Sequence, residues 1–362
     1  MDINPTPTYL EDRRTWFGKA VGELSKPFVQ LNRGLRATRL HHQFFKKAEV
    51  TPSAPGMRVI MAASRTNGLY RAYHYEIERL SAEGLLTDDT NVVLLLGQPR
   101  MYRKLLAAPP ADFADTYRIG LWVTEFEVFP PDWTFAFDIV HEIWTPSEFS
   151  ARAIRAATDL PVKVVPHAVS VPPGKPMERA RFGVRDDQFL GLAIMDLGTC
   201  PDRKNPIAHL RAWKAAFGGD PTTHLLMKVK FGKHTGFAKT ALLKEIGEAK
   251  NISLVTEMFS DADMTAFQRM ADVYVSLHRS EGYGLNIHEM LEIGTPVVAT
   301  GWSGNMDFMP KYPHAHAVPY GIVPYVDPTH HYSGEGLVWA EPDIEAAAKI
   351  LTRIQREHGQ SR

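Results

Sequence analysis

The segment from Asp272 to Met309 constrains the fold most, because it combines two strand patterns with a glycine-rich acidic turn and a helix pattern. Apolar and β-branched residues at 273–277 and 296–300 predict two buried strands. Between them, apolar residues recur at i, i+3 and i+4 from Ile287, and Gly294 stands where a helix commonly ends in a left-handed residue. The segment therefore predicts a β-turn-α-β unit in a parallel sheet, and an α/β fold.

The turn of this unit, residues 281–286, predicts an anion-binding site. Its two glycines allow a backbone to approach a ligand closely, and the unpaired N–H groups at the start of the helix favour negative charge, above all phosphate. Glu281 opens the turn and Glu289 lies two helical turns further along. One carboxylate can therefore bind hydroxyl groups in the part of a ligand before its phosphates. The other carboxylate can bind hydroxyl groups in the part beyond the phosphates.

Seven residues separate Glu281 from Glu289, and the strand Gly-Thr-Pro-Val-Val-Ala-Thr and a Ser-Gly-Asn loop follow. This pattern resembles the E-x7-E signature of retaining nucleotide-sugar glycosyltransferases. Among these enzymes, which have the two-Rossmann GT-B architecture, the chain is most similar to glycosyltransferase family 4. The spacing of the two glutamates alone would also fit an ordinary βαβ unit with a capped helix. The resemblance extends from about Gly120 to Asp343 and is strongest between Asp196 and Met309.

The resemblance implies two Rossmann-like domains whose parallel sheets face a cleft. We expect residues 57–167 to form the acceptor-side domain and residues 168–340 the donor-binding domain, with residues 341–362 forming a last helix that packs back toward the first domain. Strands are predicted at 58–62, 92–96, 116–123, 162–165, 190–195, 225–230 and 252–255, and helices at 70–80, 148–157, 207–217, 264–270 and 344–357.

Composition narrows the function classes. The chain has 41 basic and 41 acidic residues, which gives no indication of a nucleic-acid partner. A single cysteine, Cys200, excludes an internal disulfide framework and fits a reducing compartment. The sequence contains neither an apolar run long enough to span a bilayer nor the basic start and apolar core of a secretory signal. We therefore expect a cytoplasmic protein.

Residues 1–56 precede the first predicted strand and form a basic extension for which a helical structure is expected. Basic, aromatic and aliphatic residues alternate between positions 13 and 47. Packing on the first domain with a solvated basic face is the favoured interpretation. The alternative is a peripheral contact with anionic lipid at the inner face of the membrane.

Two further groups of cations follow strands of the second domain. Arg203 and Lys204 precede a helix, and in the resembled family this loop supplies basic residues to the donor diphosphate. Alternation in the next strand puts Lys228 and Lys230 on one face. The resemblance favours Lys228 as the phosphate ligand, while a solvent-facing pair remains open.

The resemblance also implies roles for individual residues of the donor site. Glu281 would hold sugar hydroxyls, Glu289 the nucleotide ribose, and the loop at Met258 the base. Gly68, in the first loop, would lie near the phosphates. The other donor-binding residues expected are Tyr283, Gly284, Leu285 and Asn286. The pattern Asp261-Ala262-Asp263 is interpreted as the charged start of a helix and not as a metal site.

Glu125 is expected at the carboxyl end of a strand, facing the cleft on the acceptor side. It would accept the proton of the acceptor hydroxyl, or it caps a helix or pairs with an arginine. With these residues, the resemblance implies a retaining, metal-independent transfer of a hexose from GDP-mannose or a UDP-hexose to a glycan, glycolipid or other acceptor, with no cofactor. A nucleotide-sugar epimerase, a phosphorylase and a non-catalytic scaffold are the alternatives. The phosphorylase would need a cofactor-lysine motif that the sequence lacks.

Overall fold

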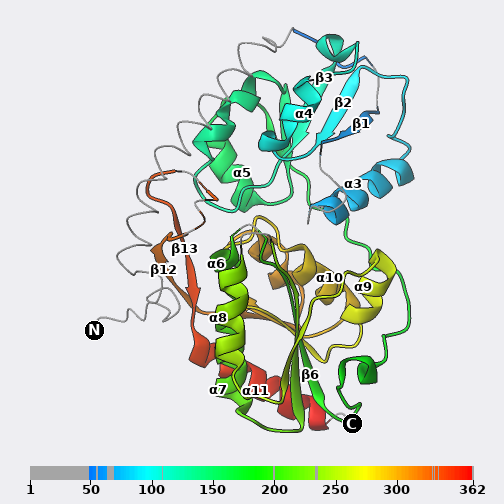
Figure 1. Ribbon diagram of the computed structural model, residues 1–362. Helices are drawn as coiled ribbons and strands as arrows, with labels where there is room; N and C mark the ends of the chain where they lie inside the picture. The colour runs from blue at the N-terminus through cyan, green and yellow to red at the C-terminus, as the bar shows by residue number, and fades with distance from the viewer. Residues whose placement is uncertain are drawn as a thin grey trace.

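The computed structural model describes residues 49–53, 56–62, 69–107, 109–198, 200–232, 235–327, 329, 331–332 and 334–360 (Figure 1). The expected helical extension, the expected lipid contact through residues 13–47 and the expected donor contact of Gly68 therefore lie outside the described residues. Within the described part of the chain, no helix is both long enough and apolar enough to cross a membrane.

The first domain is built on a five-stranded parallel sheet whose strands lie side by side in chain order. The strands are β1 (Arg58–Met61), β2 (Val92–Leu96), β3 (Tyr117–Leu121), β4 (Glu142–Thr145) and β5 (Val162–Val164). Its helices are α3 (Tyr70–Ala82), α4 (Tyr102–Ala107) and α5 (Glu148–Arg155). All five residues of β2 are buried, as expected for an inner strand of a parallel sheet that is covered on both faces.

The second domain contains a six-stranded parallel sheet with the order β11-β10-β9-β6-β7-β8. The strands are β6 (Phe189–Asp196), β7 (Thr223–Lys230), β8 (Ile252–Val255), β9 (Val273–Ser276), β10 (Val297–Thr300) and β11 (Ala315–Val318). The chain winds outward from β6 in both directions. The loops that follow β6 and β9 therefore diverge at a topological switch point, which is where sheets of this kind bind ligands.

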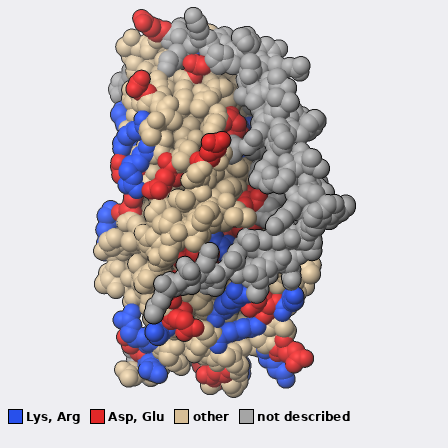
Figure 2. All heavy atoms as spheres, turned by 90° about the vertical axis from the view of Figure 1, so that its left-hand side faces the viewer, with Lys and Arg blue, Asp and Glu red and all other residues tan. Residues whose placement is uncertain are grey.

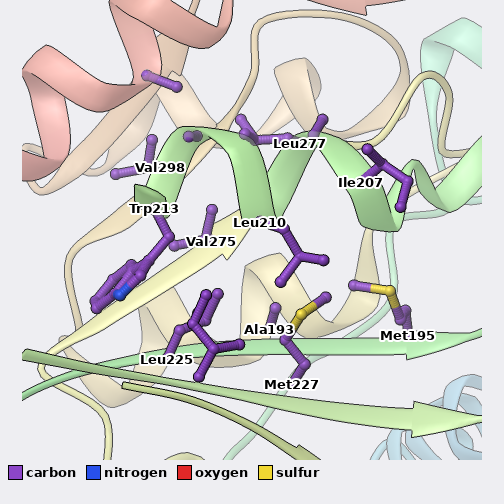
Figure 3. Packing of buried hydrophobic residues seen from close by; sticks show 14 of the residues in the cluster. Ala193, Met195, Ile207, Leu210, Trp213, Leu225, Met227, Val275, Leu277 and Val298 are labelled. Atoms are coloured by element: carbon purple, nitrogen blue, oxygen red, sulfur yellow. The ribbon is translucent and has the colours of Figure 1, made fainter. Parts of the chain in front are cut away.

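Helices cover both faces of the second sheet. They are α6 (Pro201–Lys204), α7 (Pro206–Phe217), α8 (Gly236–Ile246), α9 (Asp261–Gln268), α10 (Leu285–Ile293) and α11 (Ile344–Gln360). Figure 3 shows Ile207, Leu210 and Trp213 of α7 pointing onto the sheet, where they meet Met195 and Met227. This packing holds the loop between β6 and α7 in place, and that loop contains Arg203 and Lys204.

Every strand predicted from the sequence is present, with bounds within two residues of the expectation. Strands β4 and β11, and two strands at residues 320–324 and 338–342, were not predicted. Only one of the four residues of β11 is buried, so this strand lacks the apolar pattern of an inner strand. Helix α9 begins three residues earlier than predicted, since the Ser260 hydroxyl caps it by accepting from Asp263 N at 3.1 Å. Asp261 and Asp263 lie in its first turn, as expected.

The prediction that the last helix packs back toward the first domain is wrong. The buried face of α11, formed by Ala347, Leu351 and Ile354, joins the core of the second domain and lies against α7. In Figure 1 this helix, in red, lies at the end of the second domain that is remote from the first. Burial of its apolar face against the second sheet therefore determines its position.

The segment that does cross to the first domain is an antiparallel hairpin, residues 320–342, which we call the arm. Its strands are β12 (Tyr320–Pro324) and β13 (Val338–Pro342). Phe126, in the loop after β3 of the first domain, packs against Tyr325, Tyr332 and Trp339 of the arm with ring centroids 5.0, 4.8 and 6.2 Å away. The arm therefore joins the two domains beside the cleft.

Charged side chains of both signs are intermingled on the face of the molecule in Figure 2, most densely over its lower part. This distribution agrees with the balanced composition of the chain.

Candidate active site

The carboxyl ends of the strands in both sheets face one another across a cleft of about 700 Å³. Loops after β3 of the first domain and after β6, β7 and β9 of the second domain line it. The sequence-predicted residues that line this cleft are Glu125, Arg203, Lys204, Lys228, Met258, Glu281, Tyr283, Gly284, Leu285 and Asn286. The structure therefore brings together all the described candidates except Glu289.

The acidic turn is held by the Ser-Gly-Asn loop after β10. Ser303 accepts a hydrogen bond from Glu281 N at 2.8 Å, and Gly304 N donates to Glu281 O at 2.9 Å. Ser303 adopts a φ of 78°, a left-handed conformation that is unfavourable for a residue with a side chain. Two hydrogen bonds to the backbone of Glu281 give a physical reason for this conformation and fix the direction of the carboxylate.

Gly282 brings the turn into contact with the first domain. A Cβ atom at this position would lie 2.1 Å from Val123 Cγ1 and 2.6 Å from Thr124 O, so only glycine fits. Its carbonyl accepts a hydrogen bond from Ser147 Oγ at 2.5 Å. Ser147 also caps α5, as the sequence predicts, by accepting from Ser150 N at 3.1 Å. The turn therefore contacts loops at the ends of both sheets.

Glu281 is the centre of a buried charge cluster. Its carboxylate pairs with the ammonium of Lys204 and with Arg203 Nη1 at 3.2 Å. Burial alone would raise the pKa of Glu281, but the charges of Lys204 and Arg203 outweigh burial and hold this pKa at about 2. The carboxylate is therefore ionised at neutral pH and balances two cations.

Glu125 joins the cluster from the first domain, since its Oε1 lies 3.7 Å from Arg203 Nη2. The Ser280 hydroxyl donates to the backbone carbonyl of Glu125 and fixes the loop that bears it. Arg203 therefore lies between the carboxylates of both domains. Burial opposes the charge of Arg203, but its neighbours Tyr332, Glu281 and Glu125 raise its pKa above the ordinary value.

The two lysines of β7 differ in their partners. Lys230 pairs with Asp196 Oδ2 at 2.9 Å, which is at the end of β6. The ammonium of Lys228 lies 5.1 Å from the ring centroid of Phe259, and burial lowers the pKa of this lysine. Within the described residues, no carboxylate lies within ion-pair distance of Lys228. Of the two lysines, it is the better placed to bind an anion in the cleft.

The start of α10 adds backbone donors. Gly284 precedes the helix with a φ of 92°, and no side chain caps the first turn. Tyr283 is buried, and its hydroxyl lies 2.8 Å from His288 Nδ1. Met258, by contrast, is two-thirds exposed at 66% and borders the opening of the cleft. The donor contacts predicted for these residues remain predictions.

Glu289 is fully buried in an interdomain hydrogen-bond network instead of lining the cleft. Arg71 Nε lies 2.8 Å from Glu289 Oε1, Tyr75 donates to the same oxygen at 3.1 Å, and Gln268 donates to Oε2 at 2.7 Å. Arg71 and Tyr75 belong to α3 of the first domain. In this arrangement the carboxylate serves as the anchor for α3, and its expected contact with a ribose remains a prediction.

Sequence reasoning missed several residues of the cleft. Arg71 comes from a helix whose pattern indicated only packing, and Tyr332 comes from the arm, whose crossing was not predicted. His278 also borders the cleft, where its Nε2 lies 3.1 Å from Asn305 Oδ1. Its position directly after β9, before the acidic turn, was the one available signal.

Metal independence remains a prediction. Among the described residues, no group of three or more His, Cys, Asp or Glu side chains is arranged to hold a metal ion.

Comparison with solved structures identifies the architecture. The chain matches HepE of Anabaena, solved with UDP and glucose, at a TM-score of 0.57 and 13% identity, over 84% of this chain and 91% of HepE. The fold is that of the GT-B glycosyltransferases. A glycosyltransferase of Rickettsia africae matches at a TM-score of 0.52 and 12% identity, over 82% of this chain and 74% of the other. Trehalose-6-phosphate synthase OtsA matches at 0.51 and 13% identity, over 82% and 77%.

Sequence comparison adds no closer relative. No family model matches the chain, and no curated protein matches it. At identities of 12–13%, the GT-B likeness applies to the fold alone.

We predict that Glu281→Gln removes a pH-dependent part of the stability. The pKa of Glu281 is about 2 in the folded state, below the ordinary value of 4.5, so its contribution is complete above pH 4.5 and is lost as the pH falls toward 2. The full contribution is about 3 kcal/mol. Urea unfolding between pH 3 and 7 should show the difference between wild type and Glu281→Gln shrinking on acidification. Parallel stability curves would contradict the account of the cluster.

We also predict that Arg71→Ala destabilises the protein by about 3–5 kcal/mol, because it leaves the buried carboxylate of Glu289 without its cation. Adding Glu289→Gln should recover part of the loss, since a neutral amide needs no counter-charge. The matched control is Arg155→Ala, which breaks an exposed 2.6 Å pair with Glu148 and should cost at most about 1 kcal/mol. Equal losses in denaturant unfolding for the two arginine variants would refute the interdomain anchor.

Proposed function

We propose that this protein is a retaining, metal-independent glycosyltransferase similar to glycosyltransferase family 4. It would move a hexose from a nucleotide-diphosphate sugar to a hydroxyl group of a glycan, a glycolipid or another acceptor. The observation that carries the proposal is the set of cations and unpaired helix N–H groups around Glu281, at the switch point of the second sheet. The GT-B fold is consistent with it, and HepE, one of the structural neighbours, was solved with UDP.

The diphosphate would be the leaving group, and the enzyme must stabilise the negative charge that develops on it. Lys228 of β7, Arg203 of α6 and the N–H groups at the start of α10 come from three different segments at one edge of the second sheet. Their charges are held in position by packing and hydrogen bonds before a substrate arrives. Preorganised charge of this kind stabilises the transition state without a cost for reorganisation.

Glu281 would hold hydroxyl groups of the transferred sugar. Because Lys204 and Arg203 keep its pKa at about 2, it would stay an acceptor of hydrogen bonds throughout the reaction. A neighbouring carboxylate would also favour the positive charge that grows at the sugar ring as the glycosidic bond stretches.

Glu125 would act on the acceptor side. It belongs to the first domain and lies against Arg203, so it can orient an acceptor hydroxyl beside the departing phosphate. In the resembled family, retention proceeds without an evident protein nucleophile, with attack from the face of the leaving group. The phosphate oxygen would then help to accept the hydroxyl proton, and Glu125 would position that hydroxyl or share the proton.

The donor class follows from the resemblance and the neighbours. GDP-mannose and UDP-hexoses remain the candidates, and UDP is the first nucleotide to test because HepE was solved with it. We expect the reaction in the cytoplasm, with residues 13–47 either packed on the first domain or in contact with anionic lipid at the inner face of the membrane.

The proposal predicts nucleotide binding that depends on Lys228 and Arg203. UDP, GDP or TDP at millimolar concentration should raise the melting temperature of the wild type, and EDTA should leave this shift unchanged. Lys228→Ala and Arg203→Ala should reduce the shift to less than half, because each removes a charge from the diphosphate site.

The control for this experiment is Arg356→Ala, an exposed arginine of α11 far from the cleft, which should retain the full shift. Lys228→Ala guards against a folding defect, because Arg203 also donates to Ser280 O at 2.8 Å and supports the loop. The absence of a shift with every nucleotide would refute the proposal. An equal shift in all variants would refute the assigned diphosphate site.

A further inference from the structure

The arm brings side chains of the second domain to the acceptor side of the cleft. Beyond its aromatic contacts with Phe126, it meets the first domain through Arg100, whose Nη1 lies 2.7 Å from His331 Nε2. Arg100 lies in the turn that follows β2. Arg100, His331 and Tyr332 all line the cleft. The arm is therefore a wall of the active-site cleft as well as a connection between domains.

This wall lies at the opposite end of the cleft from the predicted base site. Met258 precedes α9, and Figure 1 shows α9 and the arm on opposite sides of the second domain. Tyr332 lines the cleft together with Arg203 and Glu125, and its ring packs 4.8 Å from that of Phe126, the residue after Glu125. An acceptor positioned by Glu125 would thus extend toward the arm.

Among the described residues, Arg100 contacts a histidine in the cleft and not a carboxylate. Arginine can only donate hydrogen bonds, so the 2.7 Å contact requires His331 Nε2 to act as the acceptor. Within the described residues, no carboxylate lies within ion-pair distance of Arg100, and this arginine is exposed to the cleft. A planar guanidinium without a carboxylate, oriented by a neutral imidazole, suits a bound anion.

We propose that Arg100, oriented by His331, binds an anionic group, phosphate or carboxylate, on the acceptor saccharide, and that Tyr332 of the arm forms the adjoining wall of the acceptor subsite. The anion would accept the forked donors of Arg100, while neutral His331 orients the guanidinium by accepting from Nη1. This inference rests on the proposed glycosyltransferase function and specifies the class of its acceptor. Arg100 and His331 are specificity-determining residues in it, and they take no part in the bond that breaks.

The test measures saccharide binding by titration calorimetry, with and without UDP. The probes are glucose, glucose 6-phosphate, glucuronate and inorganic phosphate. The wild type should bind at least one anionic saccharide more tightly than glucose, and the preferred probe distinguishes a phosphate from a carboxylate. Arg100→Ala should weaken that binding about tenfold or more, and His331→Ala should also weaken it. Arg356→Ala, on the far side of the second domain, should leave it unchanged.

UDP binding by Arg100→Ala separates the two hypotheses. Because Arg100 is not one of the cations assigned to the diphosphate, this variant should bind UDP as the wild type does, which also verifies its fold. If UDP binds but Arg100→Ala retains full affinity for the anionic saccharides, the acceptor inference is overturned while the proposed function stands. It is also overturned if the wild type binds no anionic saccharide more tightly than glucose. Loss of nucleotide binding by the wild type itself would instead refute the proposed function.

Discussion

The arrangement of the active-site cleft depends on the charge balance around Glu281. Two adjacent cations, Arg203 and Lys204, follow one strand of the sheet, and their side chains are largely withdrawn from water. Burying two like charges side by side is unfavourable unless an anion accompanies them. Glu281, from the loop after the neighbouring strand, supplies that anion. Any ligand phosphate would enter a site in which the cations are already in position.

The same constraint explains why the two domains meet where they do. The turn that carries Glu281 is hydrogen-bonded to Ser303 of the second domain, and at Gly282 it packs against the first domain. Glu125 then completes the charge cluster from the opposite side. A second interdomain ion pair, between Arg71 and Glu289, anchors α3 beside it. Because the contacts of Gly282, Glu125 and Arg71 each need both domains, the cleft geometry and the domain arrangement are coupled.

The sequence predicted the elements that carry periodic apolar patterns and the loops that follow them. The predicted strands lie within two residues of the observed bounds. The cations after β6 and the acidic turn after β9 meet because parallel strands end at one edge. What the sequence could not indicate was pairing between distant segments. Two partners of Glu289, Arg71 and Tyr75, come from a helix more than two hundred residues earlier, and no local pattern reports such a contact.

The last helix and the arm illustrate the same limit. The amphipathic pattern of α11 predicts a helix, but both domains offer apolar surfaces, and only the packed structure decides between them. The two strands of the arm correspond to two apolar runs near the C-terminus, which gave no indication that they pair as a hairpin. Its aromatic contacts with Phe126 depend on the three-dimensional path of both loops. Tyr332 was therefore beyond the reach of pattern analysis.

The most direct test of the central claim is a crystal structure of the wild-type protein with the nucleotide diphosphate that stabilises it most. We predict that the diphosphate lies in the cleft, with its oxygens within hydrogen-bond distance of Lys228 Nζ, of Arg203 and of the N–H groups at the start of α10. A nucleotide whose phosphates lie outside this cleft, or contact none of these cations, would contradict the account.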